Sequence, residues 1–218
     1  MKKGHNMKKI KLREYREACI EYADWALADK TLYRLCKMNP MHTDRYSING
    51  KLWLISRTYA TGIERQIEST GDPLSQIAEH FYKNRKKIDT VLGKLSAINE
   101  PLNQNKLEVI VKAHGQLVKL LSPILRKSKS GKHHSARSFV SKYMHFHHPI
   151  VPIYDNIAKK NLCHLIPWKD SYEIFQMKTE VDEEYYYFTL RFLQLYNELK
   201  TQDKTVTVKS VDRYLLNS

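Results

Sequence analysis

Hydrophobic and polar positions alternate along most of the chain with the three-to-four-residue spacing of an amphipathic α-helix. The spacing predicts helices over residues 8–29, 51–67, 74–98, 105–122, 138–147, 155–165, 171–177, 181–201 and 207–216. Gly and Pro, which interrupt helices, occur only seven times each, and no internal repeat or low-complexity linker marks a boundary. The sequence therefore predicts an all-α protein with a single domain over residues 1–218.

Two local signals add detail to this prediction. Asp72-Pro73 is a helix start, because proline suits the first helical position. Residues 205–208, Thr-Val-Thr-Val, form the only strand-like run, which is too short and isolated for a sheet. With 42% hydrophobic residues, the chain has enough apolar material for one core or for two small lobes that share a cleft.

The segment from residue 126 to residue 160 interrupts the pattern most strongly. Residues 126–137 contain five Lys or Arg, two His and no acid. A short amphipathic helix follows at 138–147, with Phe139, Tyr143 and Phe146 on one stripe. We expect the chain to cross between two helical lobes here, which would place a central cleft beside this segment.

Asp155 stands at the end of that crossing. Pro149 and Pro152 stop helical propagation and favour an extended backbone, and a new helix is predicted from residue 155. A carboxylate at such a junction is either a helix N-cap or an acid directed into a cleft. The residues alone leave both interpretations open.

The charge of the chain indicates the class of partner. Lys and Arg exceed Asp and Glu by 14, and the pI is near 9.6. Such an excess favours a polyanion, nucleic acid before a membrane surface. No apolar run approaches the roughly 18 residues of a membrane span, and the first residues lack the apolar stretch of a secretory signal. We therefore predict a cytoplasmic protein.

Cysteine and histidine give no firm sign of a metal or cofactor. Cys19, Cys36 and Cys163 are odd in number and lack CxxC spacing, which disfavours disulfides, a zinc ribbon and an iron–sulfur cluster. His145 and His148 are three residues apart, but Pro149 ends the helix and no carboxylate set accompanies them. The prediction is no metal and no cofactor.

One stretch resembles a known family. The run from Pro152 to Lys160, Pro-Ile-Tyr-Asp-Asn-Ile-Ala-Lys-Lys, resembles the catalytic segment of helix-hairpin-helix DNA glycosylases. That segment reads Pro, two apolar residues, Asp, two further residues, a small apolar residue and then basic residues. Together with the preceding helix, the resemblance covers about 30 residues. A weaker similarity extends over residues 52–65, where Ser56-Arg57-Thr58 follows apolar residues as Ser-Gln-Gln-Thr does in the family's early pocket helix.

The chain departs from the family in its hairpin. The family's Gly-x-Gly, whose amides hold a DNA phosphate, aligns with His133 and Ser135, and the nearby glycine is Gly131. The lysine nucleophile of bifunctional members aligns with Arg137, which cannot form a Schiff base. Lys142 lies further along the helix as the second candidate. These departures predict a monofunctional enzyme that uses water.

The resemblance assigns residues to three roles. Asp155 would be the catalytic carboxylate, with Lys142 as a weaker catalytic candidate. Contacts to DNA are expected from the basic turn and the next helix: Arg126, Lys127, Lys129, Lys132, His133, His134, Ser135, Arg137, Lys159 and Lys160. A pocket for the flipped base is expected from Trp53, Ser56, Arg57, Tyr59, Tyr154 and Trp168.

The predicted function follows from this chemistry. Breaking an N-glycosidic bond develops positive charge on the sugar, which a carboxylate stabilises, and the base must first leave the stack. The hypothesis is a monomeric DNA glycosylase for a damaged or modified base, a hypermodified phage base included, acting in base-excision DNA repair or antiviral defence. Two alternatives remain: a nucleic-acid-binding helical protein in which Asp155 is only a cap, and a basic scaffold for an acidic protein.

Overall fold

The computed structural model describes residues 11–20, 23–68, 71–127, 135–167 and 181–217. These residues form ten α-helices and no strand, so the all-α prediction is confirmed. The α-helices are α1 (Leu12–Ala18), α2 (Ala23–Met38), α3 (Arg45–Thr58), α4 (Pro73–Lys83), α5 (Arg85–Gly93), α6 (Gln104–Leu121), α7 (Arg137–His147), α8 (Asn156–Leu165), α9 (Glu183–Gln202) and α10 (Val208–Asn217). Two short 3-10 helices, η1 (Ile63–Gln66) and η2 (Ser122–Ile124), follow α3 and α6.

Five of the predicted helices occur within about two residues of their expected bounds. They are α6, α7, α8, α9 and α10. The helix expected at 171–177 lies outside the described residues. The strand-like run at 205–208 forms no strand, since it leads directly into α10 at Val208.

The first predicted helix, 8–29, is wrong as a single element. The helix α1 ends at Ala18, and α2 begins at Ala23. The two helices serve different neighbours, because α1 packs on α10 whereas α2 packs on α3 and α7. Tyr15 fixes the first docking by donating a hydrogen bond from its hydroxyl to Ser210 Oγ at 2.6 Å. A straight helix cannot follow both packing directions, so the chain turns between them.

The second and third predicted helices have the wrong bounds for local reasons. Asp44 caps α3 by accepting from the amide of Ser47, which moves the start before residue 51. The end comes early because Ala60 and Gly62 have positive φ angles of 44° and 66°. The predicted helix 74–98 is two helices, divided at Asn84, whose side-chain amide donates to the carbonyl of His80.

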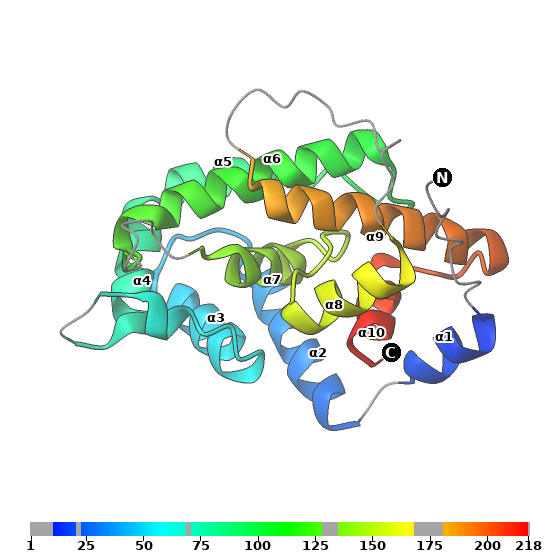
Figure 1. Cartoon of the computed structure of the whole chain (residues 1–218). Coiled ribbons are helices and arrows are strands. Elements are labelled where there is room, and N and C mark those ends of the chain that lie inside the picture. The colour runs from blue at the N-terminus through cyan, green and yellow to red at the C-terminus, as the bar shows by residue number, and fades with distance from the viewer. Residues whose placement is uncertain (1–10, 21–22, 69–70, 128–134, 168–180, 218) are drawn as a thin grey trace.

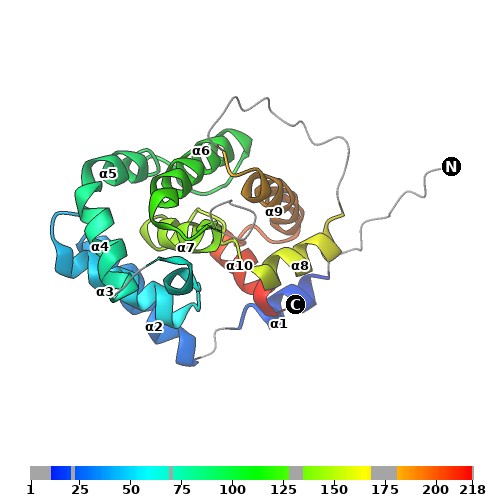
Figure 2. The ribbon, with the colours of Figure 1, turned by 60° about the vertical axis from the view of Figure 1, so that its left-hand side comes forward.

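The helices gather in two groups around α7. In the first group α3 packs on α2 and α4, and α4 on α5; in the second, α8 packs on α9 and α10, and α10 on α1. Figures 1 and 2 show α7 in the interior, with α2 and α3 on one side and α10 on the other. Contacts of α7 with α2, α3 and α6 agree with this view.

More of α7 is buried than the sequence predicts for an amphipathic helix with one apolar face. All eight residues from Phe139 to Phe146 are buried, including the polar Ser141, Lys142 and His145. The prediction of one apolar stripe was therefore too narrow. Because residues 139–146 are buried, the polar side chains among them need hydrogen-bond partners within the protein.

Buried neutral histidines couple the fold to pH. His114 of α6 stacks on Tyr185 of α9, with ring centroids 3.7 Å apart, and its Nε2 donates to the carbonyl of Arg137. Burial lowers the pKa of His114 to about 4, and burial likewise lowers the pKa of His145 to about 4. In both cases the protein favours the neutral ring.

Acidification is expected to destabilise the fold between pH 6.5 and about 4. The unfolded histidines take up protons near pH 6.5, whereas the buried rings do not until about pH 4. Each therefore contributes stability that is complete above pH 6.5 and declines by up to about 1.4 kcal/mol per pH unit below it. Urea denaturation at a series of pH values measures this slope.

The matched variant is His114→Phe, which keeps an aromatic ring beside Tyr185 but takes up no proton. Losing the hydrogen bond to Arg137 lowers the stability of the variant at every pH. The comparison therefore uses the change in stability with pH and not the stability itself. In the variant, the change in the free energy of unfolding per pH unit should correspond to the uptake of about one proton less than in the wild type. An unchanged slope would show that His114 does not link this fold to pH.

Candidate active site

A non-helical segment, residues 148–155, leads from α7 to α8; it begins with a turn at residues 149 and 150 and belongs to no strand. The amide of Val151 donates to the carbonyl of His148 at 3.0 Å within the turn, and side chains of the surrounding helices supply further hydrogen bonds. Ser141 of α7 accepts the amide of Tyr154 at 3.0 Å, and His145 donates from Nδ1 to the carbonyl of Val151 at 2.7 Å. The polar residues of the buried helix therefore hold the crossing segment in place.

Helices α9 and α10 hold the same segment from the other side. Tyr185 of α9 donates its hydroxyl proton to the carbonyl of Pro152 at 2.8 Å. Asp212 of α10 accepts the amide of Ile153 at 3.1 Å through Oδ1. With three helices bound to its backbone, the segment delivers Asp155 to a fixed position.

Asp155 is both a helix cap and a partner of Lys142. Its Oδ1 accepts from the amide of Ile157 at 2.9 Å, which caps α8. Its Oδ2 lies 2.9 Å from Nζ of Lys142, and that nitrogen also donates to the carbonyl of Tyr59 at 3.2 Å. The lysine side chain is 6% exposed and the aspartate side chain 24%, so the carboxylate is the more accessible partner.

A cavity of about 670 Å³ opens beside this pair. Its volume lies within the range of small-molecule sites, roughly 300–1,000 Å³. Residues from α2, α3, α7, α8 and α10, from the crossing segment and from the ends that follow α1 and α3 line it: Ile20, Asp29, Tyr33, Thr58, Tyr59, Ala60, Lys142, His145, Phe146, Ile153, Asp155, Ile157, Lys209, Asp212, Arg213, Leu216 and Asn217. Both interpretations of Asp155 thus hold geometrically, because the capping carboxylate also forms part of the cavity wall.

The environment favours the ionised form of Asp155. Partial burial opposes ionisation, but the Lys142 ammonium and the amide of Ile157 outweigh it and lower the pKa of Asp155 below its ordinary value. Asp155 is therefore a carboxylate at neutral pH. It provides a fixed negative charge on the wall of the cavity.

A second ionic cluster forms another part of the cavity wall. Asp29 of α2 accepts the hydroxyl proton of Tyr59 and lies 3.1 Å from Lys209 and 3.8 Å from Arg213. Lys209 also lies over the ring of Tyr33, 4.4 Å from its centroid. These contacts pair Lys209 and Arg213 of α10 with Asp29 of α2.

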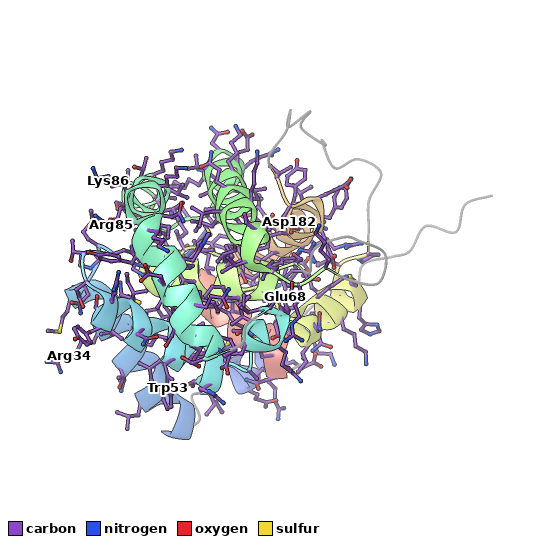
Figure 3. All side chains as sticks on the ribbon, turned by 90° about the vertical axis from the view of Figure 1, so that its left-hand side faces the viewer. Arg34, Trp53, Glu68, Arg85, Lys86 and Asp182 are labelled. Carbon is purple, nitrogen blue, oxygen red and sulfur yellow. The ribbon has the colours of Figure 1, made fainter. Side chains whose placement is uncertain are left out.

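The structure places one of the six predicted base-pocket residues, Tyr59, in this wall. Trp53 is 57% exposed on the outer edge of α3 (Figure 3). Ser56 is buried, Arg57 is paired with Glu64 at 3.0 Å, and the hydroxyl of Tyr154 donates to Glu184. Among the described residues, these four do not line the cavity. Trp168 lies outside the described residues.

The residues predicted to bind DNA have different surroundings. Arg137 is largely buried and paired with Asp182 and Glu184, and Lys159 is also paired with Glu184. Arg137 is therefore engaged within the protein rather than presented to a phosphate. Ser135 is exposed, and its hydroxyl donates to Asp182 at 3.4 Å.

Three other predicted contacts are exposed. Arg126 uses Nε to donate to the carbonyl of Ile67, while Lys127 and Lys160 face solvent. The hairpin positions Lys129, Lys132, His133 and His134 lie outside the described residues.

The sequence analysis missed the α10 side of the cavity. Lys209, Asp212, Arg213 and Leu216 follow a spacing of three, four and seven residues, which places them on neighbouring turns of one helix. One signal was available: Asp212 falls among the buried positions Val208, Val211 and Leu215. An acid on the apolar side of an amphipathic helix is unusual, and it marks a possible functional position.

No group of three or more His, Cys, Asp and Glu side chains within the described ranges could hold a metal ion. In the same ranges, no helix combines the length and apolarity that crossing a membrane requires. No protein-family model matches the chain, and no curated protein or solved structure is detectably similar to it. Functional inference therefore depends on the site itself.

Replacing Lys142 with methionine should raise the pKa of Asp155. The ammonium and its hydrogen bond keep that pKa low, and without them burial of the carboxyl dominates. Carbon-13 NMR titration of the aspartate carboxyls measures the change. The matched control is Lys159→Met, since Lys159 is paired with Glu184. If both variants leave the pKa of Asp155 as in the wild type, Lys142 does not control it.

Proposed function

We propose that the protein is a DNA glycosylase, in which the cavity receives a flipped base and Asp155 promotes hydrolysis of its N-glycosidic bond. The observation that carries this proposal is the position of Asp155, a paired carboxylate on the wall of a base-sized cavity. The sequence resemblance had selected the same residue on independent grounds. A carboxylate next to the sugar stabilises the positive charge that develops as the bond breaks.

The walls of the cavity fit an aromatic guest. Tyr33, Tyr59 and Phe146 contribute rings, and the rings of Tyr59 and Phe146 are 4.9 Å apart. Aromatic and apolar walls suit a base that has left the stack. The net charge of +14 supports a polyanionic partner outside the cavity.

Lys142 has a supporting role in this proposal. Its Nζ is engaged with the carboxylate of Asp155 and the carbonyl of Tyr59, and little of the side chain is exposed. An amine held in this way keeps the carboxylate ionised and oriented but is not presented to the sugar. Water, rather than Lys142, is then the nucleophile.

Asp155→Asn is expected to reduce base excision by at least about 100-fold, the lower end of what a positioned acid or base contributes. Asparagine caps a helix about as well as aspartate does, so α8 should persist while the charge is lost. The assay incubates DNAs of varied and modified base content with the protein and then applies alkali, which cleaves at abasic sites. Strand cleavage that is lost in the variant supports the enzyme.

A matched control is Asp72→Asn, the same substitution at the N-cap of α4, which is outside the cavity lining. It should retain excision. Equal activity of Asp155→Asn and the wild type would exclude a catalytic carboxylate at this position. DNA binding without abasic sites on any substrate would instead favour a non-catalytic nucleic-acid-binding protein.

Borohydride treatment during the reaction should yield no covalent protein–DNA adduct. The reagent reduces a Schiff base between an amine and the opened sugar, which a water-using enzyme does not form. Denaturing gel electrophoresis detects the adduct. An adduct that disappears in Lys142→Gln would overturn the water route and make Lys142 the nucleophile.

A further inference from the structure

Asp212 is a second carboxyl in the cavity wall, and its situation is the opposite of that of Asp155. Its Oδ1 accepts the amide of Ile153, whereas its buried Oδ2 has no hydrogen-bond partner among the described residues. The side chain is 5% exposed. An unsatisfied buried polar atom costs about 1–3 kcal/mol, which makes it uncommon without a functional reason.

The neighbouring histidine does not supply the missing contact. Nδ1 of His145 lies 3.7 Å from Oδ2 of Asp212, too far for a hydrogen bond. The same nitrogen is 2.7 Å from the carbonyl of Val151, which only accepts, so Nδ1 carries the proton. Nε2 is then the acceptor for the hydroxyl of Tyr33, and the ring is neutral.

The cationic side chains that line the cavity are paired with acids other than Asp212. Lys209 and Arg213, on the same helix as Asp212, are paired with Asp29 of α2, and Lys142 of α7 is paired with Asp155. With burial and no cation to offset it, the pKa of Asp212 is raised well above its ordinary value. Its surroundings therefore favour the protonated carboxylic acid, and a proton on Oδ2 would have no acceptor within the described part of the chain.

We propose that Asp212 presents a hydrogen-bond donor to the ligand of this cavity, which selects a base with a carbonyl oxygen at that position over one with an amino group. The inference rests on the proposed function and names the substrate class of the same site. A carbonyl accepts the proton of Asp212, whereas an amino group would set a donor against a donor. Asp212 is a specificity residue here and does not replace Asp155.

The first experiment tests the donor without any substrate. Infrared spectroscopy at pH 7 should show the carbonyl band of a protonated carboxyl in the wild type, and Asp212→Asn should lack it. A spectrum that is the same in both proteins would mean that Asp212 is ionised, which overturns the proposal. Because it needs no DNA, this result is independent of the glycosylase assay.

The second experiment measures binding of two matched pairs of free bases, hypoxanthine with adenine and uracil with cytosine. Within each pair a carbonyl replaces an amino group. Titration followed by protein NMR should show the carbonyl member binding about tenfold more tightly, the effect of one hydrogen bond of roughly 1.4 kcal/mol. Preference for the amino member, or binding of neither, would overturn the assignment.

Two variants of Asp212 distinguish hydrogen-bond donation to the ligand from a purely structural role. Asp212→Asn should keep the preference, since its oxygen can accept from Ile153 while its amide donates to the ligand. Asp212→Leu, similar in size but without a donor, should bind both members equally. A preference that persists in Asp212→Leu contradicts the proposal. If instead the base preference is as expected but no DNA yields abasic sites, the proposed reaction fails and the role of Asp212 stands.

Discussion

The structure depends on how the segment between α7 and α8 satisfies its backbone. Pro149 and Pro152 prevent this segment from continuing a helix, and the described residues provide it with no neighbouring strand. Buried amides and carbonyls without partners would destabilise the fold. Side chains of Ser141, His145, Tyr185 and Asp212 provide those partners. The hydrogen bonds of one short segment thereby fix three helices relative to one another.

This constraint explains why α7 carries polar residues in the interior. A fully apolar helix would pack as well but would leave the crossing segment unsatisfied. Ser141 and His145 bind the segment's backbone, and Lys142 binds the side chain at its end, Asp155. The structural need and the candidate chemistry meet in the same helix. A cap that only stabilised α8 would not require a buried lysine behind it.

Sequence patterns predicted the helical class, the interruption between α7 and α8 and a helix starting at Asp155, because these depend on local spacing and on proline chemistry. The end of a helix at Ala18 and the break at Asn84 were missed, since the first arises from docking against distant helices and the second from a side chain that bonds a nearby carbonyl. The pocket was predicted mostly from neighbours in sequence, and of those predicted residues that the structure describes, Tyr59 alone lines the cavity. Asp29, Tyr33 and Arg213 come from opposite ends of the chain, so only the tertiary fold brings them together.

The charge of the cavity wall differs from that of the rest of the chain. Inside the cavity, Lys142, Lys209 and Arg213 are paired with the carboxylates of Asp155 and Asp29, and burial raises the pKa of Asp212, which favours its neutral form. Nearly all of the excess of 14 positive charges therefore belongs to the rest of the chain. A cavity with almost balanced charge gains little from holding a phosphate but can accept a neutral ring with polar edges. The proposed nucleic-acid ligand would offer both parts, an anionic backbone for the excess of basic residues and an uncharged base for the cavity, whereas an acidic protein would offer only the first.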